Sequence, residues 1–174
     1  VKRPPKWIQN YDGKFKGFVP LRKALAESRN APTIRLAKII GMEDILETAH
    51  SLGIKTELEP YITTAIGASE VHLLELANAY RAMASGICAQ PYSVARITNR
   101  NGETVFVKDK ITGLLELDLL KLKQIQEGLR GVIRIPGGTA HSLDNSDFPI
   151  PTMGKTGTTN DFRDGLFINS TYGY

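Results

Sequence analysis

Eight residues near the C-terminus, Gly154 to Asp161, hold one lysine, three threonines and two glycines. The ammonium of Lys155 supplies a compact positive charge, and the hydroxyls of Thr156 and Thr158 can donate hydrogen bonds. Gly157 has no Cβ, so another chain can lie close to the backbone there. An edge strand with such side chains can also pair with an extended peptide. The segment therefore predicts a strand edge that binds an extended, anionic substrate.

A phosphate-binding loop is the first alternative, because Gly-Lys-Thr also ends the pattern G-x-x-x-x-G-K-[ST]. That pattern needs glycine at position 149, where this chain has Pro149. The residues that follow, Thr158 to Asp161, form helices poorly, whereas a phosphate loop opens a helix. The sequence thus excludes a nucleotide phosphate loop, and a lysine on an ordinary turn is the remaining alternative.

Proline, glycine and the spacing of apolar residues predict the helices that position this segment. We expect helices from residue 20 to between 27 and 30, and over residues 32–40, 42–52, 71–85 and 116–132. In the second of these, Pro32 is expected to open the helix and to disfavour helix at Ala31. The residues with helical period are expected to be buried: Leu73, Leu74, Ala77, Tyr80 and Ala84 in the fourth helix, and Leu119, Leu122, Ile125 and Leu129 in the fifth.

Strands are expected mainly toward the C-terminal end. Alternating residues predict strands over 92–98 and 103–108, joined at Asn101-Gly102, which is a strong hairpin signal. A loop over 136–149 leads to the strand that carries Lys155, and a last strand covers 165–169. This order predicts an α+β fold with clustered helices. Ser28-Arg29-Asn30 falls at the corner between the first two helices, where polar side chains can be held rigidly toward a cleft.

Composition narrows the class of protein. A chain of 174 residues with 41% hydrophobic content can bury one core, and no stretch approaches the length of a membrane span. The net charge of +4 comes from 22 basic and 18 acidic residues, which are interspersed. The one basic cluster is interpreted as a solvated surface and not as a nucleic-acid site; it consists of Lys2, Arg3, Lys6, Lys14 and Lys16. Lone Cys88 and the separated histidines at 50, 72 and 141 predict no disulfide and no metal site.

Two motifs together resemble a known family. Lys155-Thr156-Gly157, continued through Thr158 to Asp164, resembles the third active-site motif of class A penicillin-binding proteins, the bifunctional peptidoglycan synthases. Ser28-Arg29-Asn30 is similar to their second motif, Ser-x-Asn. Supporting matches follow in order along nearly the whole chain: residues 11–17, 66–71, 74–80, 129–132 and 138–140. The resemblance implies a partial penicillin-binding or serine β-lactamase-like transpeptidase fold, with a helical cluster plus an antiparallel sheet.

The family chemistry implies a role for each matched residue. The resemblance implies a serine acyltransferase that cross-links peptidoglycan stem peptides and is acylated by β-lactams. Lys155 would attract the substrate carboxylate, and Thr156 and Thr158 would hydrogen-bond it. The N–H of Thr158 would be an oxyanion-hole donor, and losing such a donor costs on the order of 3 kcal/mol. Ser28 would relay a proton to the leaving amine, and Asn30 would hold the substrate amide. Ser28 and Asn30 also fit a helix-end cap, which is worth about 1 kcal/mol, and the two roles are compatible.

The attacking serine of this family is expected elsewhere. The chemistry needs Ser-x-x-Lys, and no serine in this chain has lysine three positions later. We therefore expect residues 1–174 to be an internal or C-terminal part of a transpeptidase domain, truncated at both ends. The missing parts would be the Ser-x-x-Lys segment upstream of Val1 and at least one strand after Tyr174. Such a chain should be inactive alone. A non-catalytic relative that binds peptide or β-lactam, or acts as a scaffold, is the alternative.

The resemblance also implies the setting of the intact protein. Such proteins are anchored in the bacterial inner membrane by an N-terminal helix and usually carry a glycosyltransferase domain first. The transpeptidase then faces the periplasmic side, and this chain would meet the membrane only through an upstream anchor. The expected partners are stem peptides and β-lactam antibiotics, with no nucleic acid. No metal or organic cofactor is implied, because the protein supplies the nucleophile, base and oxyanion donors.

Overall fold

The computed structural model describes residues 8–109, 112–114, 118–145, 149–159 and 164–171. Asn160 and Asp161 of the predicted anion-binding segment lie outside these ranges, as do Phe162 and Arg163. So do Lys2, Arg3 and Lys6 of the basic cluster and the first two positions of the helix expected over 116–132. None of the described helices is both long and apolar enough to cross a bilayer.

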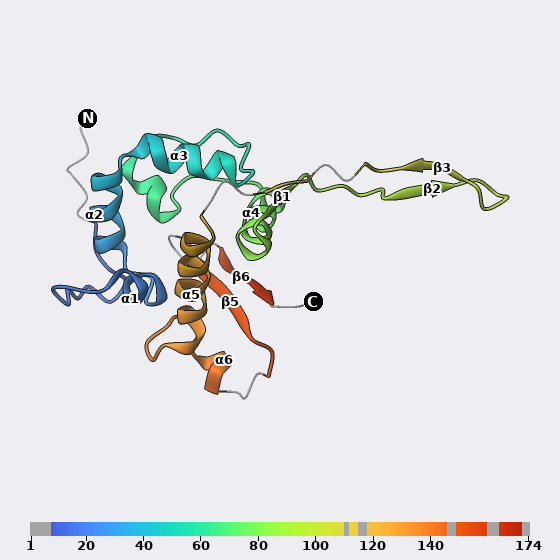
Figure 1. Cartoon of the computed structure of the whole chain (residues 1–174). Helices are drawn as coiled ribbons and strands as arrows, with labels where there is room; N and C mark the ends of the chain where they lie inside the picture. Colours follow the sequence, from blue (N-terminus) through green and yellow to red (C-terminus); the bar gives the residue numbers. More distant parts are fainter. Residues whose placement is uncertain (1–7, 110–111, 115–117, 146–148, 160–163, 172–174) are drawn as a thin grey trace.

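Along the described chain a run of helices is followed by four short strands, two further helices and a last pair of strands (Figure 1). The helices are α1 (Leu21–Ala26), α2 (Asn30–Ile40), α3 (Met42–Ser51), the 3-10 helix η1 (Ile62–Ile66), α4 (Leu73–Ser85), α5 (Leu119–Arg134) and α6 (Ser142–Asn145). The strands are β1 (Ile87–Ala89), β2 (Arg96–Thr98), β3 (Thr104–Val107), β4 (Thr112–Leu114), β5 (Thr152–Thr158) and β6 (Gly165–Thr171). Among the described residues the strands pair antiparallel as β1–β4, β2–β3 and β5–β6.

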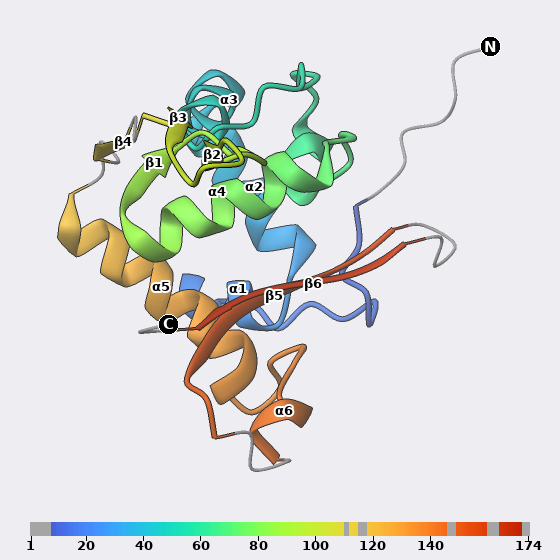
Figure 2. The same ribbon diagram turned by 90° about the vertical axis from the view of Figure 1, so that its right-hand side faces the viewer.

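Helix α5 packs against both segments that end in or carry predicted site residues, α1 before Ser28 and β5 with Lys155. It contacts α1 on one side and β5 on another (Figure 2). Glycines allow the close approach to α1, because a Cβ at Gly128 would lie 2.8 Å from Leu25 Cδ2. Val132 and Ile133 near its C-terminal end are buried and form a core with Ala140. The end of α1 and the middle of β5 are therefore held against one rigid helix.

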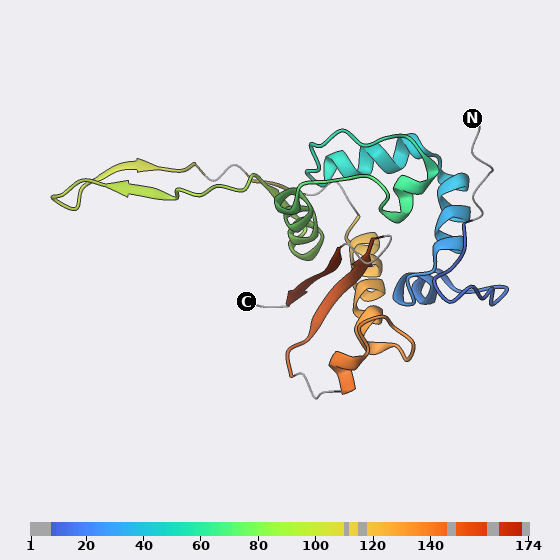
Figure 3. The same cartoon turned by 180° about the vertical axis from the view of Figure 1, so that it is seen from behind.

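The β2–β3 hairpin projects away from the helices, as the view from behind shows (Figure 3). Its connection at Asn101-Gly102 confirms the hairpin expected there, with Gly102 at a φ of 84°. Both strands are exposed along their described length. The hairpin therefore takes no part in the arrangement around β5.

Several expectations about elements were wrong. Helix α2 begins at Asn30, two residues before Pro32, because the first-turn N–H groups of a helix have no partner inside the helix and proline can occupy that turn. The sequence also did not predict β1, β4, η1 or α6. The helices at 21–26, 42–51, 73–85 and 119–134 match expectations to within a few residues.

The expected buried faces were partly wrong. Leu73 and Leu74 are each 65% exposed, and Ala77 is exposed as well. In α5, Leu119 is 74% exposed and Ile125 also lies outside the core, whereas Leu122 and Leu129 are buried as expected. Helical period fixes which residues share a face, but not how far along the helix that face is covered. In α4 the buried positions are the small residues Ala79 and Ala82.

Candidate active site

Helix α1 ends in a Schellman turn that places Ser28 in a left-handed conformation. The N–H of Ser28 donates to the carbonyl of Leu25 at 3.1 Å, and the N–H of Arg29 donates to that of Ala24 at 2.9 Å. This turn normally has glycine where Ser28 lies. With a φ of 52°, Ser28 is the one non-glycine residue of positive φ in the described part of the chain. A side chain in this conformation costs about 1–2 kcal/mol, so the position is strained.

The turn directs the Ser28 hydroxyl toward β5. Lys155 lies in the middle of β5, opposite Ile168 of β6. Its Nζ donates to Ser28 Oγ at 2.7 Å and to the carbonyl of Thr156 at 2.7 Å. Burial lowers the pKa of Lys155, because the surroundings disfavour its charged form. The structure thus joins two predicted site residues that are 127 positions apart in sequence.

Thr156 is fixed from a third segment of the chain, which follows α5. The hydroxyls of Thr139 and Thr156 share a hydrogen bond, and the N–H of Thr139 donates to the carbonyl of Ala26 at 3.1 Å. The neighbouring Gly138 passes close to α5, since a Cβ there would lie 2.3 Å from the carbonyl oxygen of Val132. Residues 138–140 matched the family in sequence, but no role was expected for Thr139. Thr139 thus connects the strand, through its hydroxyl, to the end of α1, through its backbone N–H.

Asn30 lies in the first turn of α2 and faces residues 8–20, the loop before α1 that is called the N-terminal loop below. Its Nδ2 donates to the carbonyl of Gln9 at 3.1 Å. The N-cap position of α2 is Arg29, and the N–H of Ala31 donates to Asn10 Oδ1 at 3.1 Å. The alternative that the side chains of Ser28 and Asn30 cap a helix end is therefore wrong. The backbone of Ser28 completes the end of α1, and Asn10 from the loop caps α2.

The two glycines of the strand have different reasons to be glycine. A Cβ at Gly154 would lie 2.7 Å from the carbonyl oxygen of Ile168, so the pairing with β6 requires glycine there. A Cβ at Gly157 would find Leu166 Cβ as its nearest neighbour, at 3.9 Å. Within the described residues, packing therefore does not require glycine at 157, and the backbone is open to a chain from outside.

The antiparallel register decides where the N–H of Thr158 points. Thr158 pairs with Gly165, and the N–H of the next residue, Thr159, donates to the carbonyl of Asp164 at 3.1 Å. Hydrogen-bonded and non-hydrogen-bonded pairs alternate along an antiparallel ladder. The Thr158–Gly165 pair is thus a non-hydrogen-bonded one, and the N–H of Thr158 points away from β6.

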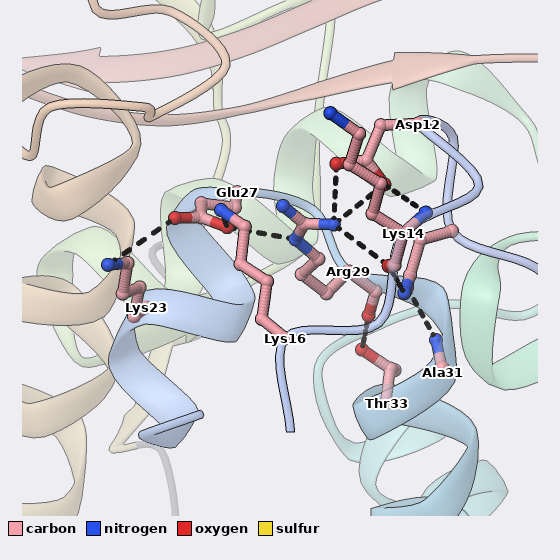
Figure 4. Close-up of polar contacts among 9 residues, drawn as sticks. Asp12, Lys14, Lys16, Lys23, Glu27, Arg29, Ala31 and Thr33 are labelled. Carbon is pink, nitrogen blue, oxygen red and sulfur yellow. Dashed lines mark hydrogen bonds and ion pairs between the residues drawn. The ribbon is translucent and has the colours of Figure 1, made fainter. Parts of the chain in front are cut away.

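Beside the Ser28 turn lies a set of ion pairs that the sequence did not predict (Figure 4). Arg29 is 8% exposed and pairs with Asp12 and Glu27, both at 2.8 Å. Lys16 pairs with Glu27 at 2.9 Å. The basic cluster was interpreted as a solvated surface, and for Lys16 the structure adds an ion pair to that interpretation. A cavity of about 200 Å³ lies between these side chains and Ser28. Charged residues at 12, 16, 27 and 29 gave no local signal that they would meet.

Hydrogen bonds hold both carboxylates of this set in their charged form. The N–H of Lys14 lowers the pKa of Asp12, with a further contribution from the guanidinium of Arg29. The ammonium of Lys16 lowers the pKa of Glu27, and Arg29 adds to that effect. Lys23 also pairs with Glu27, at 3.8 Å, so at neutral pH the set contains two anions and three cations.

Known proteins resemble this chain in sequence and in fold. The sequence profile described as the penicillin-binding protein transpeptidase domain matches residues 1–169. Penicillin-binding protein 1A of Aquifex aeolicus is 35% identical over 165 residues, which are 93% of this chain and 22% of that protein. The chain therefore spans about a fifth of the length of this curated relative.

Solved structures show the same fold. Penicillin-binding protein 1A of Haemophilus influenzae matches 97% of this chain and 31% of its own with a TM-score of 0.80, at 20% identity. Penicillin-binding protein A of M. tuberculosis, solved as an imipenem acyl-enzyme complex, matches 94% of this chain and 42% of its own with a TM-score of 0.77, at 19% identity. At these identities the likeness establishes the fold, which is the α+β arrangement expected from the sequence.

Proposed function

Because this chain belongs to the family of penicillin-binding protein transpeptidase domains, we propose that the intact protein is a D-alanyl-D-alanine transpeptidase that cross-links peptidoglycan. It would act through an acyl-serine and be joined to a glycosyltransferase. The contact between Lys155 Nζ and Ser28 Oγ, at 2.7 Å, carries the proposal, because it joins the family's second and third motifs in one site. Residues 1–174 form the part of that domain which holds these two motifs.

The donor stem peptide would lie along the free edge of β5. Its terminal carboxylate would bind the ammonium of Lys155 and the hydroxyls of Thr156 and Thr158. The attraction is stronger at a half-buried amine than in open water, because the effective dielectric constant is lower. An arriving carboxylate also favours the charged form of Lys155, which offsets the effect of burial on its pKa. The open face at Gly157 supports this placement of the peptide.

The N–H of Thr158 would stabilise the charge that develops during acylation. It points away from β6, toward the edge where the peptide would lie. A backbone donor held in a strand needs no reorganisation when the carbonyl oxygen becomes an oxyanion. This supports its role as an oxyanion-hole donor.

The acylation step would use a serine that these 174 residues do not contain, since they hold no Ser-x-x-Lys. The lysine of that motif would take the proton from the serine hydroxyl as its oxygen attacks the donor carbonyl, the C–N bond to the leaving D-alanine would break, and the proton would pass on through Ser28. Ser28 would pass a proton to that amine, while Lys155 donates to the same Oγ. Asn30 would hold the substrate amide. The acceptor amine would then attack the ester, lose a proton and release the serine. With a β-lactam the ring amide opens and the acyl group stays attached.

Labelling of the intact protein with a fluorescent penicillin tests the function. We expect a covalent adduct that survives denaturing electrophoresis and is blocked by prior exposure to unlabelled penicillin. The isolated 174-residue chain should give none. An intact protein without an adduct would instead be a non-catalytic relative that binds or scaffolds. An adduct on a serine of the isolated chain would refute the assignment of the nucleophile to another segment.

We also propose that the intact protein is anchored in the bacterial inner membrane with this domain on the periplasmic side. The substrate supports this, because peptidoglycan is assembled there. Protease treatment of spheroplasts tests it: residues 1–174 should be cleaved without lysis. Protection of these residues until the membrane is broken would contradict the proposed orientation.

A further inference from the structure

The strained turn at Ser28 needs a restraint that the backbone does not provide. An ordinary Schellman turn has glycine at this position, and a side chain there favours other backbone conformations. Two backbone hydrogen bonds, at 3.1 and 2.9 Å, close the turn, but they would form equally with glycine. A serine that must keep its hydroxyl toward Lys155 therefore depends on its neighbours to hold the turn.

The next residue, Arg29, is held from two sides. Its Nε donates to Glu27 Oε2 at 2.8 Å, and its Nη1 donates to Asp12 Oδ1 and Oδ2 at 2.8 and 2.9 Å (Figure 4). Nη1 also reaches the carbonyl of Lys14 at 3.4 Å. Glu27 directly precedes Ser28 and Arg29 directly follows it. The ion pair between them therefore spans the strained residue itself.

The same contacts connect the turn to the N-terminal loop. Asp12 comes from that loop, and Lys16 of the loop pairs with Glu27 at 2.9 Å. Asn10 donates to the carbonyl of Lys14 at 2.8 Å and is 6% exposed, so the loop is itself fixed. The side chains of Arg29 and Glu27 are 9% and 6% exposed. The side chains that surround this pair are more open, with Asp12 38%, Lys16 44% and Lys23 49% exposed. Breaking the Arg29–Glu27 pair is costly, because removing one partner leaves a buried charge unpaired.

We propose that Arg29 is a positioning residue: by joining Asp12 and Glu27 across the turn, it holds Ser28 in its left-handed conformation with the hydroxyl on Lys155. The inference rests on the proposed function, because the hydroxyl has a chemical task only in transpeptidation. Arginine suits this position because its planar guanidinium donates in two directions from separate nitrogens. A lysine has one nitrogen and cannot reproduce both contacts in the same geometry.

The test compares Arg29→Lys with wild type in the intact protein. Single-turnover acylation by a fluorescent penicillin, followed at several concentrations, separates the binding constant from the acylation rate constant. We expect the rate constant to fall about ten- to hundredfold, because a displacement of about 1 Å of a catalytic group can cost a hundredfold. The binding constant should change less than about threefold. Arg134→Lys is the matched control: Arg134 pairs with Asp144 at 3.6 Å, its side chain is 51% exposed, and its variant should behave as wild type.

A double variant distinguishes positioning from general stability. In a Ser28→Ala background, Arg29→Lys should slow acylation less than about twofold, because the hydroxyl that it positions is gone. A full loss in that background, or no loss in the single variant, overturns the inference. If Arg29→Lys does not fold, Asp12→Asn removes one side of the contact and should give a smaller loss of the same kind.

A second measurement does not depend on catalysis. Acetylation of Lys155, mapped by mass spectrometry under native conditions, reports whether its amine is still held against Ser28. Arg29→Lys should raise the modification rate several-fold, whereas Arg134→Lys should leave it unchanged. If wild type forms no penicillin adduct, the proposed function fails. The acetylation result still decides the positioning inference, because an unchanged rate would overturn it.

Discussion

Replacing Lys155 by alanine should separate substrate binding from stability. Its Nζ makes hydrogen bonds of 2.7 Å to Ser28 Oγ and to the carbonyl of Thr156, so the variant loses both. It also removes a group whose charged form is disfavoured by burial, as the lowered pKa shows. These effects oppose one another in the free energy of unfolding. We therefore expect a loss of about 1 kcal/mol or less, which is about 2–4 °C in melting temperature for a domain of this size.

The effect on acylation should be much larger. A hydrogen bond to a charged group contributes about 1.5–3 kcal/mol, and each 1.4 kcal/mol corresponds to about a tenfold change. The second-order rate constant for acylation by penicillin should therefore fall about 10- to 150-fold in Lys155→Ala. The cause is the loss of the ammonium that binds the carboxylate, together with the donor to Ser28.

The assay is the rate of fluorescent-penicillin labelling of the intact protein, with melting temperature measured on the same samples. Lys123→Ala, which removes an exposed lysine of α5, is the control for loss of a positive charge. A penicillin methyl ester lacks the free carboxylate. With the ester, the acylation rates of Lys155→Ala and wild type should therefore differ less than they do with the free acid. Equal labelling by the free acid, with a melting temperature lowered by 10 °C or so, would refute carboxylate binding and indicate a structural lysine.

Three further outcomes follow from the same contacts. Gly157→Ala should leave the melting temperature within about 2 °C of wild type, because the nearest atom to the added methyl group within the chain is 3.9 Å away. The same methyl group would face the substrate, so acylation should slow at least about tenfold. Equal labelling would contradict an approach of the substrate along β5. Gly138→Ala should lower the free energy of unfolding by about 1–3 kcal/mol in denaturant titration, since its methyl would lie 2.3 Å from a backbone oxygen. Gly113→Ala is the control and should leave that free energy unchanged, because no atom lies within 4 Å of the added methyl group. Asp12→Asn should flatten the acid limb of stability against pH. The lowered pKa of Asp12 gives stability that is present above its ordinary value of 3.8 and lost as pH falls through the folded value, so melting curves from pH 6 to about 2 should converge at the acid end; parallel curves would refute this contribution.

The C-terminal ends of α2 and α4 were predictable because they depend on local chemistry. Gly86 ends α4 at Ser85 with a φ of 70°, and Gly41 follows α2 with a φ of 98°, as glycines at helix ends do. Burial was less predictable, because it depends on what covers a face. The periodic leucines at the start of α4 and α5 remain exposed, although helical period places them on the face expected to be buried.

The meeting of Ser28 and Lys155 was implied by motif resemblance and by nothing local. Their separation of 127 residues is bridged by α5, which contacts both α1 and β5. The pairing of Arg29 with Asp12 could not be inferred at all, because a charged residue in a loop looks the same in sequence whether it is solvated or buried in an ion pair. Only the fold of the N-terminal loop against α1 brings these charges together.

The position where the chain breaks a local rule is also where its proposed chemistry lies. Glycine at the Schellman position would relieve the strain at Ser28, but it would leave no hydroxyl for Lys155. A strain of about 1–2 kcal/mol persists only where the surroundings determine the conformation more strongly than the backbone does. The ion pairs of Arg29 on the two sides of the turn supply that determination. Strain, buried charge and the hydroxyl contact are thus parts of one arrangement, in which a structurally unfavourable residue is kept for the atom it places.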